Sequence, residues 1–264
     1  MLKSIDIQCR DCIETMAEME PASVDLVVTS PPYNMTSRAG GYADTGRYDV
    51  YTDWKTEDEY VDWTLSLFSG FDRVLKKDSA VVYNFSYSIE NPALPYRLVA
   101  DLQAKSRFAL VDTVIWKKAS GLPFPANLRR LSRIWEFIWV FARKDELGTF
   151  RVHKKVSRKS AKTGQTYWKV HYNLVEARNN DEPTPELNQA TYSSELVLKL
   201  LDIYAADGYT VFDPFNGTGT TGLACKMSPL KDLEYVGSEI SERQVRHSLR
   251  RISGWQEPEG IDSF

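Results

Sequence analysis

Two short loops contain residues whose types and spacing suit ligand binding or catalysis. In the first, Thr29-Ser30-Pro31-Pro32-Tyr33 directly follows an apolar run at 24–28. The prolines stiffen the backbone, so Pro31 can present a fixed carbonyl beside the Ser30 hydroxyl and the flat ring of Tyr33. Two acceptor oxygens next to an aromatic face can hold the exocyclic amine of a base pulled from its stack, with the amine lone pair turned toward an activated methyl group. The alternative is a proline-rich turn that binds no ligand.

The second loop, residues 215–222, contains Gly217, Gly219 and Gly222 in the spacing G-x-G-x-x-G after an apolar run at 211–213. Glycines let the backbone approach a ligand closely, and the start of a helix offers free N–H groups. Glu239 ends the next apolar run, 20 residues after Gly219, and a carboxylate there can accept hydrogen bonds from both ribose hydroxyls of an adenine nucleoside. The same spacing occurs in dinucleotide-binding folds, so an NAD-dependent dehydrogenase and a glycine turn without a ligand are alternatives.

Both loops need a scaffold that brings them together. Short apolar runs alternate with helical periodicity along the 264 residues, which predicts a doubly wound α/β fold around a mostly parallel sheet. The predicted strands are 4–8, 24–28, 80–85, 111–116, 137–141, 211–213 and 235–238, the fourth and fifth as a pair. The predicted helices are 12–19, 56–76, 95–103, 193–204, 220–226 and 241–252. Since ligands bind at the carboxyl ends of parallel strands, we expect the two loops to meet there.

The net charge of −3 hides a strong local bias. Segment 143–169 carries a charge of +7, which leaves −10 for the rest of the chain. Tyr167, Trp168 and Tyr172 lie among or beside these basic residues. Basic side chains interleaved with aromatic rings are typical of a surface that binds nucleic-acid phosphates. A solvated surface loop is the alternative.

Other features restrict the class of protein. No run of about 18 apolar residues is present, and the first residues lack the apolar core of a signal peptide, so we expect a cytoplasmic protein with no membrane contact. Cys9 and Cys12 form a C-x-x-C that has no second pair at zinc-finger spacing, which favours ordinary reduced thiols over a redox motif. The histidines are scattered and predict no metal site; they are His153, His171 and His247.

Taken together, Ser-Pro-Pro-Tyr and Phe215-Asn216-Gly217-Thr218-Gly219 resemble the two motifs of the DNA amino-methyltransferases. Their order along the chain resembles the circularly permuted β class of that family. The similarity covers nearly the whole chain and includes Asp11-Cys12, Ile115-Trp116-Lys117-Lys118 and Asp213-Pro214-Phe215. The resemblance implies a Rossmann-like class I methyltransferase fold, S-adenosylmethionine as cofactor and double-stranded DNA as substrate.

The resemblance also assigns roles to residues. Ser30, Pro31, Pro32 and Tyr33 are the predicted catalytic residues, which hold the target base. The predicted cofactor-binding residues are Asp11, Cys12, Thr29, Thr191, Ser193, Asp213, Pro214, Phe215, Asn216, Gly217, Gly219, Thr220, Thr221, Glu239 and Ile240. Among them, Glu239 is expected at the ribose and Asp11 at the adenine amino group. The predicted DNA-binding residues are Lys117, Arg129, Arg130, Arg133, Lys154, Lys155, Arg158, Lys159 and Lys162.

The expected division of the chain is a catalytic part at 1–119, a target-recognition region at 120–187 and a cofactor-binding catalytic part at 188–264. A strand near 136–141 belongs either to the target-recognition region or to the catalytic sheet. Serine at position 30 favours cytosine N4 as the methylated atom, with adenine N6 as the alternative. A non-catalytic DNA-binding protein on the same scaffold is a further alternative. A cognate restriction endonuclease and a homodimer are partners that the family leaves open.

Overall fold

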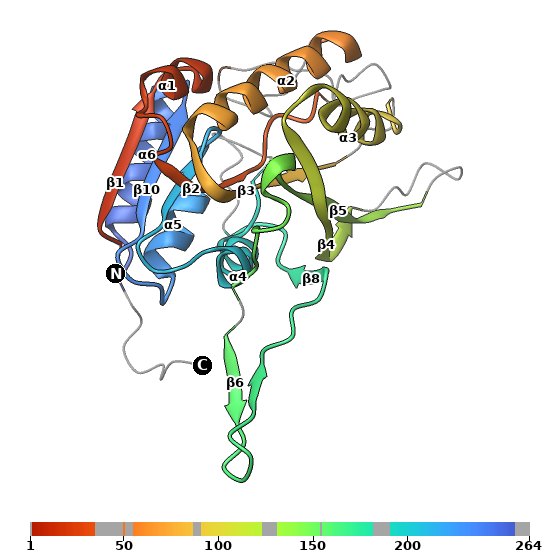
Figure 1. The fold of residues 1–264 in the computed structure, drawn as a ribbon. Helices are drawn as coiled ribbons and strands as arrows, with labels where there is room; N and C mark the ends of the chain where they lie inside the picture. Colours follow the sequence, from red (N-terminus) through yellow and green to blue (C-terminus); the bar gives the residue numbers. More distant parts are fainter. Residues whose placement is uncertain are drawn as a thin grey trace.

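The computed structural model describes residues 2–34, 50, 55–86, 91–122, 131–153, 155–181 and 191–256. Its centre is an eight-stranded sheet with the order β1-β10-β9-β2-β3-β5-β4-β8 (Figure 1). The strands are β1 (Ser4–Cys9), β2 (Val24–Thr29), β3 (Leu75–Phe85), β4 (Phe108–Leu122), β5 (Arg133–Arg143), β8 (Leu174–Ala177), β9 (Thr210–Asp213) and β10 (Glu234–Glu239).

The pairing of the strands confirms the mostly parallel sheet predicted from the sequence. In the part of the sheet with the order β1-β10-β9-β2-β3, all neighbouring strands are parallel. β5 is antiparallel to both β3 and β4, and β8 is parallel to β4. The predicted strands 111–116 and 137–141 pair as expected, in the β4–β5 ladder. The strand near 136–141 therefore lies in the same sheet as β2 and β9, the strands that precede the two chemical loops.

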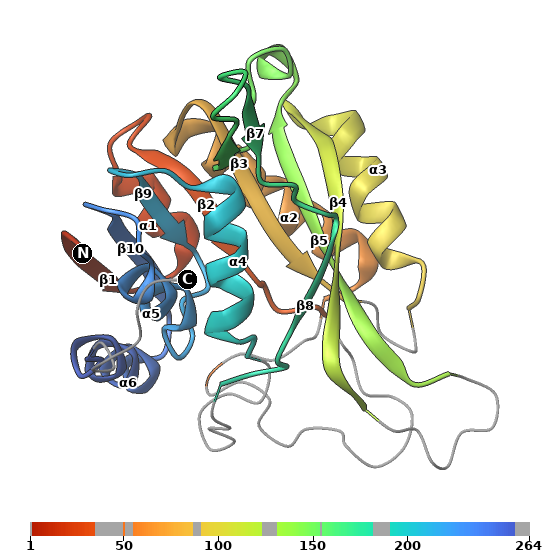
Figure 2. The same ribbon diagram turned by 90° about the horizontal axis from the view of Figure 1, so that it is seen from below.

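Helices cover both faces of the sheet, as in a doubly wound fold (Figure 2). On one face lie α1 (Cys12–Glu18), α2 (Glu57–Val74) and α3 (Leu94–Lys105), whose Met16, Phe68 and Leu98 share a core. On the other face lie α4 (Ser194–Tyr204), α5 (Thr220–Met227) and α6 (Glu242–Ser253). Figure 1 shows α2 and α3 at the top and α4 below the sheet. β2 is buried on both faces, with Leu26 in one core and Val27 in the other.

The element boundaries follow local chemistry. α2 begins at a capping box, in which the Thr56 side chain accepts from Glu59 N and the Glu59 carboxylate accepts from Thr56 N. β3 begins five residues earlier than predicted, because Leu75 pairs with Val24 directly after α2. The strand then passes through Asp78, whose φ is +61°. Because the first residues of β3 include polar side chains and this irregular backbone, they do not form an apolar run that would predict a strand.

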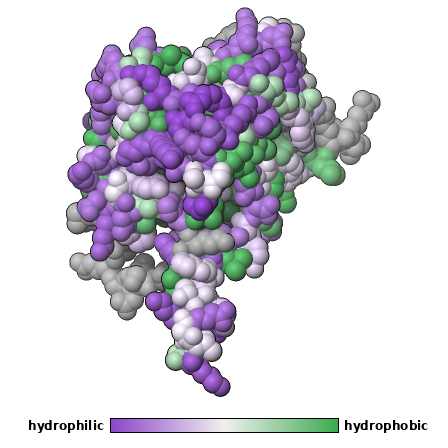
Figure 3. All heavy atoms as spheres, in the orientation of Figure 1, coloured by the Kyte–Doolittle hydropathy of each residue, from purple (hydrophilic) through white to green (hydrophobic). Residues whose placement is uncertain are grey.

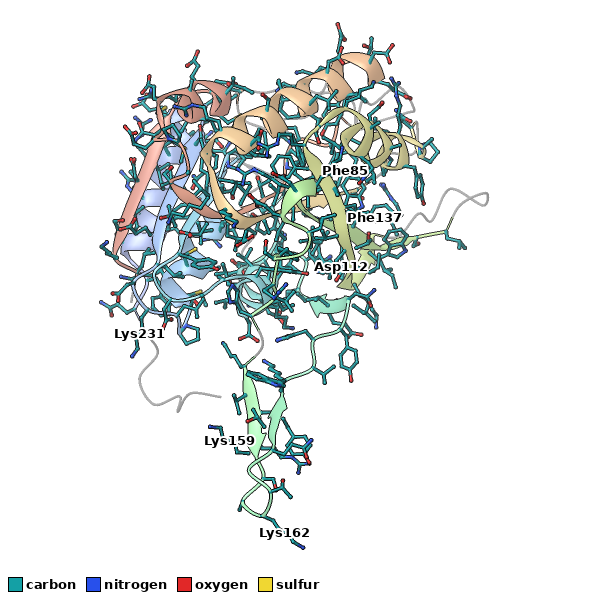
Figure 4. All side chains as sticks on the ribbon, in the orientation of Figure 1. Phe85, Asp112, Phe137, Lys159, Lys162 and Lys231 are labelled. Atoms are coloured by element: carbon teal, nitrogen blue, oxygen red, sulfur yellow. The ribbon has the colours of Figure 1, made fainter. Side chains whose placement is uncertain are left out.

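A second, two-stranded sheet lies outside the main one. β6 (Val156–Lys159) and β7 (Thr166–Trp168) form an antiparallel hairpin that projects from the body (Figures 1 and 4). We call residues 155–169 the basic hairpin. The chain reaches it from the end of β5 through a 3-10 turn, η1 (Lys144–Glu146), and His153 N donates to Ile203 O in the last turn of α4. The sequence analysis did not predict these two short strands.

The surface seen in Figure 3 is mostly hydrophilic over the body, with smaller hydrophobic patches, and is mixed along the hairpin. None of the helices in the described ranges is long and apolar enough to cross a membrane.

Candidate active site

The two chemical loops leave the sheet side by side. β2 and β9 are parallel neighbours, with Leu26 paired to Val211 and Val27 to Phe212, so both strands end at the same edge. Thr29 Oγ1 donates to Asp213 Oδ1 over 2.7 Å and joins the two strand ends directly. We call this edge the pocket edge.

A cavity of about 200 Å³ opens between the loops at the pocket edge. Of the residues predicted from the sequence, those that line it are Asp11, Cys12, Ser30, Pro31, Pro32, Tyr33, Thr191, Asp213, Pro214, Phe215, Asn216, Gly217, Thr220, Glu239 and Ile240. The lining residues that the sequence analysis did not assign to the site are Arg10, Val50, Lys55, Trp63, Tyr192, Thr218, Ser238 and Gln244. The early and late motifs of the chain therefore share one cavity.

Predicted contact residues that do not line the cavity support its wall from behind. The Ser193 hydroxyl accepts from Leu196 N and donates to Arg178 O, so it caps α4. Thr29 and Thr221 are buried and donate to Asp213. Gly219 begins α5 with φ +83°, where a Cβ would lie 2.6 Å from that of Ser248. Short polar side chains next to the motif thus turn inward, where buried acceptors need donors.

Asp213 is the buried centre of this edge. Its Oδ1 accepts from Thr29 Oγ1 and from Phe215 N at 3.0 Å, and its Oδ2 accepts from Thr221 Oγ1 at 2.6 Å and from the Tyr192 hydroxyl at 3.3 Å. Burial raises the pKa of this carboxyl, while the donors oppose the rise. One side chain thereby joins β2, the glycine loop, α5 and the segment before α4.

Glu239 closes the neighbouring side of the cavity, at the end of β10. Its Oε2 accepts from Gly217 N at 2.8 Å and its Oε1 accepts from Ser241 N at 2.9 Å. Burial raises the pKa of the Glu239 carboxyl, and these backbone donors oppose the rise. Gly217 has φ +51°, which suits glycine and turns its N–H toward the carboxylate. An acceptor pair at this position can receive hydroxyl groups of a nucleoside.

The start of α1 forms another part of the wall. Asp11 caps the helix by accepting from Ile13 N at 2.7 Å. Cys12 is buried, and burial raises the pKa of its thiol. A thiol with a raised pKa is a poor nucleophile, which disfavours the redox interpretation of Cys9 and Cys12.

Aromatic rings form a flat, apolar part of the cavity wall. The rings of Trp63 and Phe215 lie 5.6 Å apart, and Lys55 Nζ lies 5.4 Å from the centre of the Trp63 ring. The sequence analysis assigned Trp63 no role in the site; the residue lies within the helix predicted at 56–76. Its helical spacing carries no signal that separates a core tryptophan from one that lines a cavity.

The Ser30–Tyr33 loop is held by a hydrogen-bonded network. The Tyr33 hydroxyl lies 2.8 Å from Ser30 Oγ, 2.8 Å from Asn84 Oδ1 and 3.1 Å from Glu136 Oε2. Tyr60 donates to Pro32 O at 2.5 Å. The sequence analysis assigned no role here to Asn84 or Glu136, which come together only because the end of β3 pairs with the start of β5.

The predicted DNA-binding residues fall into two groups. Lys117 on β4 and Arg133 at the start of β5 lie where this ribbon passes the end of β3 at the pocket edge. The other described members, Lys155, Arg158, Lys159 and Lys162, lie on the basic hairpin (Figure 4). Arg129, Arg130 and Lys154 lie outside the described residues.

The basic hairpin is rooted at the opposite edge of the sheet from the cavity. Lys155 and Lys169 both pair with Asp202, in the last turn of α4, whereas the cap of α4 at Ser193 lies at the pocket edge. The 11 residues of α4 span about 16 Å at the usual helical rise. Within the described part of the chain, no cluster of three or more His, Cys, Asp or Glu residues could hold a metal ion.

Comparison with known proteins gives consistent matches. A family model described as DNA methylase matches residues 24–250. The type II methyltransferase M.Cfr9I of Citrobacter freundii is 23% identical over 278 residues, which cover 92% of this chain and 86% of the relative. The DNA adenine methyltransferase YhdJ of Escherichia coli K12 is 25% identical and covers 92% of this chain and 80% of its own.

Solved structures share the fold. The cytosine-N4-specific PvuII DNA methyltransferase matches with a TM-score of 0.72 at 20% identity, over 99% of this chain and 89% of its own. The M1.HpyAVI structure in complex with SAM matches with a TM-score of 0.60 at 20% identity, over 94% of this chain and 99% of its own.

Proposed function

The chain belongs to the DNA methylase family, and on that premise we propose that it transfers a methyl group from S-adenosylmethionine to the N4 amino group of cytosine in double-stranded DNA. The observation that carries the proposal is the single cavity that the Ser30–Tyr33 loop and the glycine loop line together. A methyl donor held by one loop and a base held by the other would face each other there, and bringing two reactants together in the right orientation supplies much of a methyl-transfer rate.

S-adenosylmethionine is the cofactor, and when bound it supplies an activated methyl group. The residues present fit it. The Glu239 carboxylate, fixed by Gly217 N and Ser241 N, offers its oxygens to the ribose hydroxyls. Trp63 and Phe215 offer flat faces to the purine and to the methionine chain. In this proposal Asp11, which lines the cavity at the start of α1, accepts from the adenine amino group.

The Ser30–Tyr33 loop prepares the target amine. The exocyclic amine is a weak nucleophile because its lone pair is conjugated with the ring. Ser30 Oγ and Pro31 O accept its two N–H groups, which turns the lone pair out of conjugation and toward the methyl group. The Tyr33 ring, held edge-to-face against Phe85 at 5.1 Å, stacks on the everted base. Tyr60 fixes the loop through Pro32 O.

The proposed DNA contacts fall into two groups, one beside the cavity and one on the basic hairpin. Lys117 and Arg133 would meet phosphates beside the target base, and the basic hairpin would meet phosphates of the duplex beyond it. In this proposal residues 120–187, apart from the sheet strands β5 and β8, act as the target-recognition region. Such contacts give affinity that is independent of sequence and falls with salt.

The choice of target base has support on both sides. Ser30 and the fold shared with a cytosine-N4-specific enzyme favour cytosine, whereas a relative named for adenine favours adenine N6. Expression in a host without DNA methylation, followed by mass spectrometry of the digested DNA, decides between them. N4-methylcytosine is the expected product, and N6-methyladenine alone would overturn the cytosine assignment.

Two rival functions are separated by simple binding and labelling assays. Calorimetry should give binding of S-adenosylmethionine and none of NAD; the reverse would favour a dehydrogenase. Incorporation of labelled methyl groups into DNA, lost in Tyr33→Ala, would exclude a DNA-binding protein without catalysis.

Partners beyond DNA follow from the relatives' names. Because several relatives are type II methyltransferases, we infer that a cognate endonuclease recognises the same DNA sequence. We also expect the enzyme to act in the cytoplasm. Homodimer formation is a separate prediction that light scattering of the purified chain tests.

A further inference from the structure

The hydrogen bonds around Tyr33 have a fixed direction. Asn84 Nδ2 donates to Phe137 O at 2.9 Å and to Glu136 Oε2 at 3.2 Å. Both partners are acceptors, so the amide nitrogen must lie on that side and Asn84 Oδ1 must face the Tyr33 hydroxyl. Asn84 is 3% exposed, and the amide is enclosed by strands β3 and β5.

The Tyr33 hydroxyl, which has one proton, therefore faces two acceptor oxygens. Asn84 Oδ1 lies at 2.8 Å and Glu136 Oε2 at 3.1 Å from its oxygen. The Lys118 ammonium donates to the other oxygen of the Glu136 carboxylate at 2.5 Å. If the Tyr33 proton pointed at Ser30 instead, oxygen lone pairs would face each other at both contacts, which is costly in a buried site.

The consequence falls on Ser30. Its hydroxyl lies 2.8 Å from the Tyr33 oxygen, and because the Tyr33 proton is directed at Asn84 and Glu136, Ser30 must donate its own proton to Tyr33. The lone pairs of Ser30 Oγ remain for the cavity, which Ser30 lines. A base group that meets Ser30 there can donate a hydrogen bond but cannot accept one.

We propose that Glu136 and Asn84 are specificity-determining positioning residues, which make Ser30 an obligate acceptor so that the pocket selects a base with an exocyclic amine over one with a keto oxygen. The proposal rests on the proposed function. It holds for either target, because cytosine and adenine carry an amine where uracil and hypoxanthine carry a carbonyl.

Glu136→Gln should replace the donor that the Tyr33 oxygen receives. Lys118 requires an oxygen, so the new carboxamide would turn its nitrogen toward Asn84 and Tyr33. Asn84 would keep its bond to Phe137 O, and the new carboxamide nitrogen would donate to the Tyr33 oxygen in place of the Ser30 hydroxyl. Ser30 would keep its own proton for the cavity and could donate it to the oxygen of a keto group.

The test uses the full chain and duplexes of its own methylation sequence, mapped from modified host DNA. In one duplex the target position carries the amino base and in the other its keto counterpart, each opposite an abasic site so that the cost of eversion is matched. With S-adenosylhomocysteine present, we expect wild type to bind the amino duplex at least about tenfold more tightly. In Glu136→Gln we expect the ratio to fall below about threefold.

Controls separate this effect from general damage. Glu234→Gln makes the same carboxylate-to-carboxamide change at the start of β10, where Glu234 pairs with Lys3, and should keep the wild-type ratio. If Glu136→Gln does not fold, Tyr33→Phe removes the group that takes the Ser30 proton and should also lower the ratio. An unchanged ratio in a folded Glu136→Gln or Tyr33→Phe protein overturns the proposal. No methyl incorporation by wild type, in contrast, overturns the proposed function itself.

Discussion

The pocket edge and the basic hairpin lie at opposite edges of the sheet and are built in opposite ways. At the pocket edge, polar groups are buried and held by several partners, as in Asp213 with its four donors. On the hairpin, all of β6 is exposed, and Arg158 lies over the Tyr167 ring, 4.4 Å from its centre. One region fixes atoms in place, and the other presents charge to solvent.

The difference indicates how each region contributes to function. Methyl transfer needs orientation, which buried hydrogen bonds supply. Attraction of a polyanion needs exposed positive charge and tolerates a mobile geometry. Substitutions at the pocket edge should therefore change turnover or stability, and those on the hairpin should change DNA affinity and its dependence on salt.

Ser30→Ala should have the largest effect. It removes one of the two proposed acceptors for the target amine, and we expect the methyl-transfer rate at saturating DNA and cofactor to fall at least about 100-fold. Single-turnover methylation measures it, with Ser253→Ala at the end of α6 as the control. A rate within about threefold of wild type would remove Ser30 from the mechanism.

Asp213→Asn should come next, through stability. The new amide hydrogens would face donors at Thr221 and Tyr192, which should lower the free energy of unfolding by about 2 kcal/mol. Asp202→Asn, which loses the exposed pairs with Lys155 and Lys169, should cost less than about 1 kcal/mol. Denaturant unfolding compares the two. Equal losses would contradict the contrast between the regions.

Neutralising the hairpin should affect DNA binding alone. With Arg158, Lys159 and Lys162 all changed to Gln, we expect DNA affinity to fall about tenfold and the slope of affinity against salt to drop by about 2 to 3. The methylation rate at saturating DNA should stay at the wild-type value. Lys226→Gln with Lys231→Gln is the control, since these lysines lie on α5 and in the turn after it (Figure 4 labels Lys231). An unchanged slope would mean that the hairpin does not touch the duplex.

The smallest effect concerns pH. In the proposed site the charged Glu239 carboxylate accepts the ribose hydroxyls, and burial raises the pKa of this carboxyl above the ordinary glutamate value. Cofactor binding should be full above that raised pKa and should weaken, by about threefold, as the pH falls through it, earlier than for an exposed glutamate. Calorimetry across pH measures this, and Glu239→Gln should bind weakly with no such dependence. A wild-type affinity that is flat down to the ordinary glutamate range would contradict the assignment.

The sequence predicted what depends on local pattern. Apolar runs followed by Pro31-Pro32 or by glycines mark strand ends, and the rule that ligands bind at the carboxyl ends of parallel strands correctly predicted that both loops share one edge. It did not predict the roles of Asn84 and Glu136, because their contact depends on the register of β3 against β5. Nor did it predict the hairpin, since strands of four and three residues are too short to show alternation.

The adjacency of β2 and β9 also restricts the order of folding. The cavity needs Ser30 from the early part of the chain and Glu239 from the late part. Residues 31–209, which add β3, β5, β4 and β8 on the other side of β2, must be synthesised before β9 can insert beside β2. During synthesis, β2 waits with its β9 side uncovered until most of the chain has emerged. Catalytic competence should therefore appear late and all at once, and a nascent chain that stops before β9 should depend on chaperones to keep that open edge from aggregating.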